Sequence, residues 1–176
     1  REAVFAVISS KFKARQSIKN YNNEIGLPLT VIGVGHQGKS AIGWLRVFLK
    51  ALWLLAWRDN EYPKILILEM GVDRPGDMGY LLDIVKPKVG VLTKIGESHL
   101  EFFKSIDEIK EEKFLLVKNL PKDGYAILNF ADEKIREIAK RVEANIISYG
   151  LGEEAEVKVE DIKFSNAVEF KPENFY

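Results

Sequence analysis

Four short runs of apolar residues have the length and composition of β-strands, and segments with helical periodicity separate them. The runs lie at 64–71 (KILILEMG), 88–96 (KVGVLTKIG), 125–130 (YAILNF) and 145–150 (NIISYG). The continuous apolar character of the first two predicts strands buried on both faces, as in a parallel sheet. Helices are predicted over 77–86, 107–119 and 132–143. This alternation predicts an α/β fold, a doubly wound and mostly parallel sheet flanked by helices.

The remaining segments are shorter or more polar. Residues 1–10 have a helical pattern with no capping residue ahead of Arg1, and a short strand and a polar turn follow them. Residues 41–57 are almost wholly apolar and predict a helix, which we interpret as an insertion. The alternating tail, residues 154–176, predicts strands of an antiparallel or edge type. We expect a single, incomplete domain over residues 1–176.

Composition narrows the class of protein. The chain has 176 residues, 47% of them apolar and 30% charged, which is typical of a globular domain rather than a disordered one. Basic and acidic residues number 26 each, so no bulk charge indicates a nucleic-acid partner. The absence of cysteine excludes disulfides and thiolate chemistry and is consistent with a cytoplasmic location.

Residues 33–40 read GVGHQGKS and satisfy the G-x-x-x-x-G-K-[ST] pattern of a phosphate-binding loop. In such a loop backbone N–H groups cradle phosphates, while Lys39 and Ser40 would serve phosphate and Mg²⁺. An apolar run precedes the loop, a helix follows it, and a later strand ends at Glu69. The competing interpretation is a glycine-rich turn that leads into the apolar helix, since the run before it lies close behind Pro28.

Polar residues follow the predicted strands where each strand ends. Glu69 lies near the end of the first apolar run, Thr93 and Lys94 near the end of the second, and Asn129 near the end of the third. In a parallel sheet these positions share one edge, and ligands bind beyond that edge. The sequence therefore predicts a polar site along the carboxyl ends of the strands.

Four strings, in this order and spacing, resemble the central ATP-binding domain of the Mur ligases over roughly residues 1–150. They are NYNNEIGLPLT (20–30), ILILEMGVDRPGDM (65–78), VGVLTKIGESHLEFF (89–103) and DGYAILNFADEK (123–134). In that family a phosphate loop ending in Gly-Lys-Thr-Thr directly precedes the helix that corresponds to residues 1–10. The resemblance implies that this loop and the two flanking domains lie outside the sequence, and that residues 33–40 are not the phosphate site.

The resemblance is greatest to the members that join D-alanyl-D-alanine to UDP-N-acetylmuramoyl-tripeptide in peptidoglycan synthesis. It implies ATP and Mg²⁺ as cofactors, and a UDP-MurNAc-peptide and D-Ala-D-Ala as substrates. In these ligases ATP phosphorylates a substrate carboxylate, and an amine attacks the acyl phosphate to give an amide. We expect this chain alone, without the phosphate loop, to be inactive.

The family also implies metal-binding and catalytic positions. Glu69 corresponds to a Mg²⁺ ligand, His99 in GESHLE to a metal-coordinating and catalytic histidine, and Lys113 to a catalytic lysine that is carbamylated to bridge metal ions. The alternatives are structural. Glu69 could cap a helix or form a salt bridge, His99 could be a core imidazole, and Lys113 could lie on a solvated helix face.

Cofactor and substrate positions follow by the same resemblance. Asn129 and Asp132 match an Asn-x-x-Asp that contacts the adenine and ribose of the nucleotide, although Asp132 could equally be the N-cap of the next helix. The substrate end corresponds to Asn22, Asn23 and Glu24, which could also form a plain turn. Lys94 departs from the family, where Asn is common in TNIG.

The helix predicted at 41–57 carries a second kind of signal. On a helical wheel Arg46, Lys50, Trp53 and Trp57 fall within about a 60° arc. Cations and indoles on an apolar helix are typical of helices that lie at a membrane surface, so we expect peripheral membrane or partner contact there. The alternative is packing in the interior or against another domain.

Two other functions remain open at this point. One is a self-contained P-loop NTPase that uses Gly33–Ser40, with Glu69 as its acid. The other is a non-catalytic scaffold or membrane-surface module that keeps the fold without the chemistry.

Overall fold

The computed structural model of the chain describes residues 1–18, 20–57, 59–96 and 101–158. The helices are α1 (Glu2–Ser9), α2 (Gly26–Ile32), α3 (Ala41–Ala56), α4 (Asp77–Ile84), α5 (Ile106–Lys118) and α6 (Glu133–Ala139). The strands are β1 (Ala14–Gln16), β2 (Ile65–Ile67), β3 (Val89–Leu92), β4 (Tyr125–Asn129), β5 (Asn145–Gly150) and β6 (Val157–Lys158). Every strand pairing among the described residues is parallel, and the α/β prediction is confirmed.

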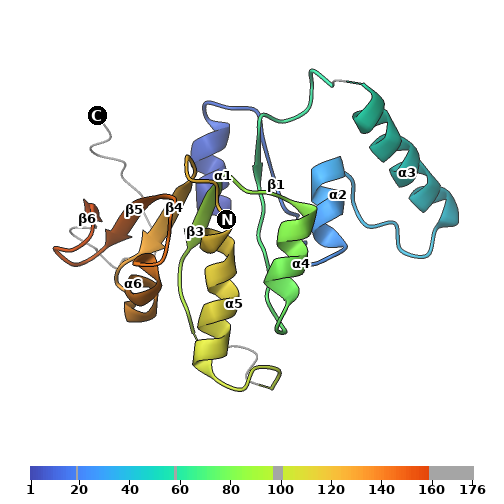
Figure 1. Cartoon of the computed structure of the whole chain (residues 1–176). Coiled ribbons are helices and arrows are strands. Elements are labelled where there is room, and N and C mark those ends of the chain that lie inside the picture. Colours follow the sequence, from blue (N-terminus) through green and yellow to red (C-terminus); the bar gives the residue numbers. More distant parts are fainter. Residues whose placement is uncertain (19, 58, 97–100, 159–176) are drawn as a thin grey trace, which may run out of the picture.

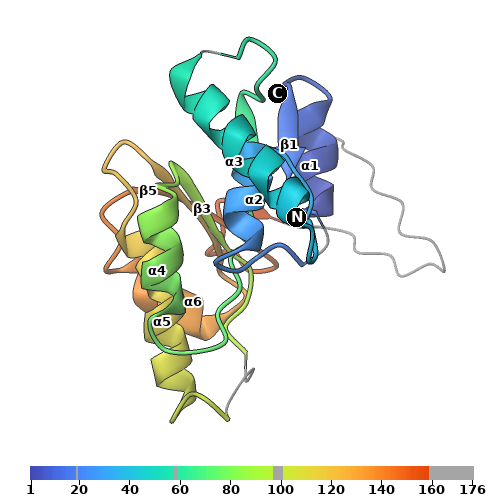
Figure 2. The ribbon, with the colours of Figure 1, turned by 90° about the vertical axis from the view of Figure 1, so that its right-hand side faces the viewer.

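Hydrogen bonding divides the strands into two sheets instead of the single sheet predicted. β1 pairs with β2, and β3 to β6 form a four-stranded sheet in sequence order. The larger sheet and α6 lie on one side of the molecule in Figure 1, and β1, β2, α2 and α3 lie on the other. The two halves contact each other through helices. α4 and α5 lie side by side in both ribbon views (Figures 1 and 2).

The main core lies between one face of the four-stranded sheet and the helices α5 and α6. Strand residues that point to this face are buried, and so are the helix residues opposite them: Leu92, Ala126, Leu128, Phe114, Val117, Ile135 and Ile138. On the other face Val89 is 49% exposed, Val91 38% and Tyr125 44%. Burial of β3 on both faces was therefore a wrong prediction, because α5 and α6 pack on the same side of the sheet.

The smaller half is organised around the carboxyl end of α2. The helix ends at Gly33, whose φ of 75° is the left-handed conformation that glycine adopts most readily. Three donors reach the last carbonyl groups: Arg15 Nη1 bonds Val31 O at 2.8 Å, Tyr62 Oη bonds the same oxygen at 2.8 Å, and Lys50 Nζ bonds Gly33 O at 3.0 Å. These bonds satisfy carbonyls that a helix terminus leaves free, and they tie β1 and α3 to α2.

The end of α6 and the direction of β6 differ from the sequence-based prediction. α6 ends at Ala139, because the next N–H groups turn back to carbonyls three residues earlier, Arg141 N to Ile138 O at 3.0 Å and Val142 N to Ala139 O at 3.1 Å. β6 pairs parallel to β5 at the edge of the sheet, so the antiparallel alternative is wrong for this strand. Residues 159–176 of the predicted tail lie outside the described residues.

One-sided burial of the sheet can be tested by two substitutions on neighbouring strands. Leu128→Ala removes a fully buried side chain, and we expect it to lower the free energy of unfolding by about 2–5 kcal/mol. Val91→Ala, on the exposed face, should cost about 1 kcal/mol or less. Urea unfolding followed by circular dichroism measures both. Equal losses would mean that both faces are covered.

Candidate functional site

Lys113, Asn129 and Asp132 meet at the carboxyl ends of β3 and β4. Lys113 lies on α5 and its Nζ is 3.4 Å from the carbonyl oxygen of Lys94, just after β3. Asn129 is the last residue of β4, and its Nδ2 donates to Thr93 O at 2.8 Å. The structure therefore brings together three of the residues predicted from strand ends and from the family resemblance.

Asp132 fixes this edge through both of its carboxylate oxygens. Oδ2 accepts from the backbone N–H of Ile95 at 2.8 Å, and Oδ1 accepts from that of Lys134 at 3.0 Å. The second bond is the N-cap of α6, so the structural alternative for Asp132 holds. Asn129 Oδ1 similarly accepts from Ala131 N at 3.0 Å. Both side chains thus hold the turns on which any ligand of this edge would rest.

The ammonium group of Lys113 lies in a partly desolvated position. Partial burial lowers its pKa below the ordinary lysine value, and the negative charge of Asp132 opposes this shift. Between the lowered pKa and the ordinary value the unfolded chain binds more protons, so this group makes the free energy of unfolding rise with pH in that window. Lys113 is itself half-buried, so it does not lie on a fully solvated helix face.

The predicted metal ligand Glu69 and the predicted substrate residues form a second group, two residues beyond the end of β2. The Glu69 carboxylate lies 3.3 Å from Arg1 Nη1, and its backbone N–H donates to Ser17 Oγ at 3.3 Å. Asn22 O accepts from Gly71 N at 2.8 Å, which places the 22–24 turn against this loop. Glu69 therefore has the salt bridge that the structural alternative predicted.

Asn23 and Glu24 have different environments within that turn. Asn23 Oδ1 accepts from Gly26 N at 2.9 Å, and its carbonyl oxygen accepts from Leu27 N, so this residue holds the turn that leads into α2. Glu24 is exposed. The turn interpretation of these residues is thus observed, and a role at the substrate end stays a prediction.

Of the two metal ligands predicted, Glu69 and His99, the structure describes only Glu69. His99 lies outside the described residues. Within the described part of the chain no three His, Cys, Asp or Glu side chains gather into a metal site. Glu69, whose side chain is 47% exposed, could supply one carboxylate oxygen. A single protein carboxylate is compatible with Mg²⁺, which usually keeps several waters and binds substrate phosphates.

The phosphate-loop alternative for residues 33–40 is wrong in its structural context. A phosphate loop follows a β-strand, whereas Gly33 ends a helix and the segment connects α2 to α3. Its backbone donors are also used internally: Gly38 N donates to His36 Nδ1 at 2.9 Å, and His36 N to Tyr21 Oη at 2.7 Å. The Ser40 hydroxyl caps α3 by accepting from Gly43 N.

Two residues that the sequence did not single out hold the site in position. Glu112 on α5 is 8% exposed, and its Oε1 accepts from Met78 N at 2.8 Å in the first turn of α4. It joins α4, which follows the loop after Glu69, to α5, which carries Lys113. Ser17, 1% exposed, holds the backbone of Glu69. A buried acid inside a charged helical run and a serine at a strand end have no distinctive sequence signal.

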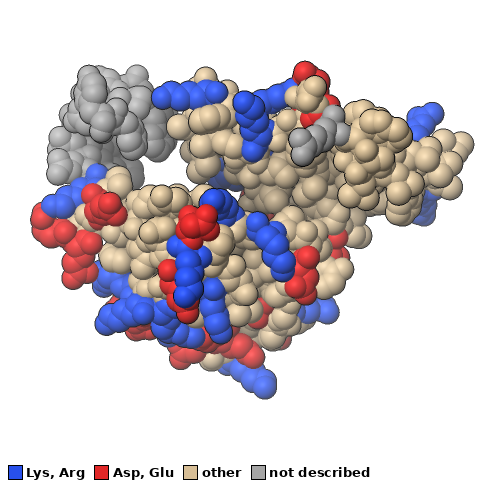
Figure 3. Space-filling model, turned by 45° about the horizontal axis from the view of Figure 1, so that its top comes forward, with Lys and Arg blue, Asp and Glu red and all other residues tan. Residues whose placement is uncertain are grey.

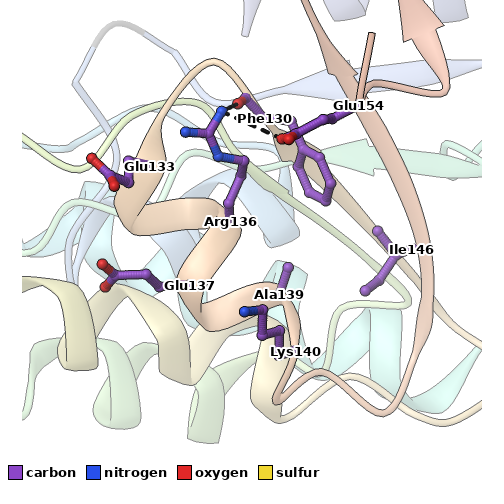
Figure 4. Close-up of a pocket in the computed structure, with 8 residues that line it drawn as sticks. All are labelled: Phe130, Glu133, Arg136, Glu137, Ala139, Lys140, Ile146 and Glu154. Atoms are coloured by element: carbon purple, nitrogen blue, oxygen red, sulfur yellow. Dashed lines mark hydrogen bonds and ion pairs between the residues drawn. The ribbon is translucent and has the colours of Figure 1, made fainter. Parts of the chain in front are cut away.

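Two cavities lie beside this edge and not within it. One, of about 560 Å³, lies between α6 and the strand β5. In Figure 4 Arg136 extends from α6 toward Glu154, 3.7 Å away, while donating to Phe130 O at 2.9 Å. A second, of about 360 Å³, is lined by the same arginine and by residues 151–155. Neither is lined by a residue predicted for the site, although both include Phe130, which follows Asn129.

Comparison with known proteins identifies a family for most of the chain. The model of the Mur ligase middle domain matches residues 52–174. UDP-N-acetylmuramoyl-tripeptide–D-alanyl-D-alanine ligase of Rickettsia prowazekii is 29% identical over 163 residues, 90% of this chain and 31% of that protein. The Bacillus subtilis enzyme of the same name is 26% identical, over 94% of this chain and 30% of its own length.

Solved structures agree with this relationship. The MurF ligase of Thermotoga maritima, in complex with ADP, superimposes with a TM-score of 0.64 at 29% identity, over 85% of this chain and 29% of that one. This chain spans about a third of the length of the relatives that it matches.

The electrostatic environment of Lys113 gives a direct test of the Lys113–Asp132 pair. With ¹³C-methylated lysines, NMR titration should show Lys113 with a midpoint below the ordinary value of about 10.4. Asp132→Asn, which keeps a capping side chain but removes the negative charge, should lower that midpoint further. An unchanged or higher midpoint in the variant would mean that the two groups do not interact.

Proposed function

The chain belongs to the Mur ligase family, and we propose that it is the central part of a ligase that adds D-Ala-D-Ala to a UDP-MurNAc-peptide in peptidoglycan synthesis. The family match over residues 52–174 supports this proposal. The observation that carries it is the grouping of Lys113, Asn129 and Asp132 at one edge of the parallel sheet. Ligands of such sheets bind at that edge.

The proposed reaction has two steps. The γ-phosphoryl group of ATP is transferred to a carboxylate of the UDP-MurNAc-peptide, giving an acyl phosphate and ADP. The amine of D-Ala-D-Ala then attacks the acyl carbon, an amide bond forms, and phosphate leaves. Phosphoryl transfer depends mainly on position and on neutralising the charge of the phosphates. Rigidly held polar groups at the sheet edge are suited to that task.

Lys113 is the residue to which we give the central catalytic role. Desolvation lowers its pKa, so a larger fraction of the amine is neutral at a given pH than for a solvated lysine. A neutral amine can add to CO₂, forming an N–C bond and releasing a proton, which turns the cation into an anionic oxygen ligand. We propose that this carbamate, together with Glu69 and His99, would hold Mg²⁺. Bound Mg²⁺ would neutralise the phosphate charge.

We assign Asn129 and Asp132 to the nucleotide. Each polar end of the Asn129 amide makes one internal hydrogen bond, which leaves one N–H and one lone pair for an adenine or ribose edge. Asp132 uses both oxygens to hold backbone, and each oxygen retains a further lone pair. Asn22, Asn23 and Glu24 are proposed for the substrate end. We place the protein in the cytoplasm, with peripheral membrane contact through α3.

The proposal predicts ligase activity in the full-length protein. ATP-dependent phosphate release should require both the UDP-MurNAc-tripeptide and D-Ala-D-Ala. Lys113→Ala should lower kcat by about 100-fold or more, since it removes charge stabilisation worth several kcal/mol. Lys110→Ala, on the same helix but ion-paired to Asp107 and Glu137, serves as the matched control and should retain activity. Full activity of Lys113→Ala would remove the catalytic assignment.

The discarded phosphate-loop alternative gives a second prediction. Residues 33–40 join two helices, and their backbone N–H groups already donate to other groups of the protein. Lys39→Ala should therefore leave the Kd for ATP within about twofold of the parent value. Isothermal titration with a non-hydrolysable ATP analogue measures this. A loss of ten-fold or more would restore residues 33–40 as the nucleotide site.

A further inference from the structure

The outward face of α3 is apolar over its whole length and is exposed. Residues on the opposite side, Gly43 and Val47, are buried against the rest of the molecule. The outward side chains are between 56% and 85% exposed at Ile42, Leu45, Phe48, Leu49, Leu52 and Leu55. The alternative that this helix packs in the interior is wrong. Figure 1 shows α3 at the far side of the molecule, with α2 between it and α4.

Specific bonds hold α3 in this orientation. Ser40 caps its first turn, Trp44 Nε1 donates to Gly38 O at 3.1 Å, and Lys50 Nζ bonds Gly33 O. Lys50 therefore faces the body of the protein and is not part of an outward stripe. Trp57 lies beyond the helix end in an extended conformation, so the stripe predicted from the helical wheel is wrong at two of its four positions.

The charged residues of α3 and of the loop before it have one sign. Residues 25–58 contain four basic residues and no Asp or Glu, in a chain whose total charge is zero. Lys39 and Arg46 are exposed. In Figure 3 the lobe at the right is mostly uncharged, with basic side chains at its margin. A surface that binds α3 must therefore be apolar where it contacts the exposed aliphatic side chains and negatively charged where it meets Lys39 and Arg46.

We propose that α3 docks in the plane of an anionic lipid surface, with its aliphatic face in the acyl boundary and Lys39 and Arg46 at the headgroups. A wide apolar face, flanking cations and aromatic residues near the ends are what such helices require. At 16 residues the helix is about 24 Å long. No helix of the described residues is long and apolar enough to cross a membrane. A protein partner fits less well, because protein interfaces carry about one hydrogen bond per 100–200 Å², and this face offers few donors.

Co-sedimentation of the intact protein with vesicles tests the proposal. We expect binding to phosphatidylglycerol–phosphatidylcholine vesicles and much weaker binding to phosphatidylcholine alone. Leu49→Glu should weaken binding by at least about tenfold, since it places a charge in the acyl boundary. Arg46→Gln should weaken it by about fivefold, and salt should act in the same direction. All three tryptophans of the chain lie at 44, 53 and 57, so a blue shift of their emission on binding would report on this segment.

Val7→Glu on α1 is the matched control, because Val7 is also an exposed aliphatic residue, 72% accessible, and the variant should bind vesicles like the parent. Ligase activity in solution should be unchanged in Leu49→Glu, which separates this proposal from the proposed function. Indifference to both vesicle types would overturn the proposal. So would a dimer, seen by light scattering, that Leu49→Glu dissociates without any vesicle binding, since the face would then belong to a second copy.

Discussion

The carboxylate of Asp132 is the interaction on which the candidate site depends. One oxygen holds the backbone at Ile95, after β3, and the other holds the first turn of α6. These are charge-assisted bonds to backbone donors, stronger than neutral ones. The same carboxylate faces the ammonium of Lys113 and opposes the effect of burial on it. A single side chain thus links two strand ends, two helices and the charge state of the central lysine.

The site is accordingly a product of parallel topology and helix packing together. The strands bring their carboxyl ends to one edge, but α5 supplies the lysine, and α5 is itself placed by the core beneath the sheet and by the Glu112–Met78 bond to α4. That bond also connects the Lys113 group to the half of the molecule that holds Glu69. The two groups of predicted residues therefore belong to one framework, although no bond between described residues joins them directly.

Sequence patterns predicted the elements well where a single physical signal dominated. The helix predicted at 107–119 and the strand that ends in Asn129 are both observed, and the apolar run before Glu69 contains β2, which ends two residues earlier at Ile67. The prediction that β3 is buried on both faces was wrong, because an apolar run does not indicate which face of a strand the helices will cover. The structural roles of Glu112 and Ser17 could not be predicted from the sequence for a similar reason, because each residue bonds to a partner distant in sequence. Residues 33–40 match the phosphate-loop pattern in sequence only. They follow a helix that ends at Gly33 in the left-handed conformation, whereas a phosphate loop follows a strand.

The pairing of β1 with β2 has a consequence for how this fold changes over time. Ala14 pairs with Ile65, so the two strands close a loop of about 50 residues that contains both α2 and α3. Loop-closure entropy grows only with the logarithm of length, and lengthening such a loop by one 16-residue helix costs about 0.3 kcal/mol. The pairing of β1 with β2 would therefore be little affected by the insertion or removal of a helix such as α3. An element of this kind can be acquired, elongated or deleted during divergence while the register of the strands, and the chemistry at their ends, stays the same.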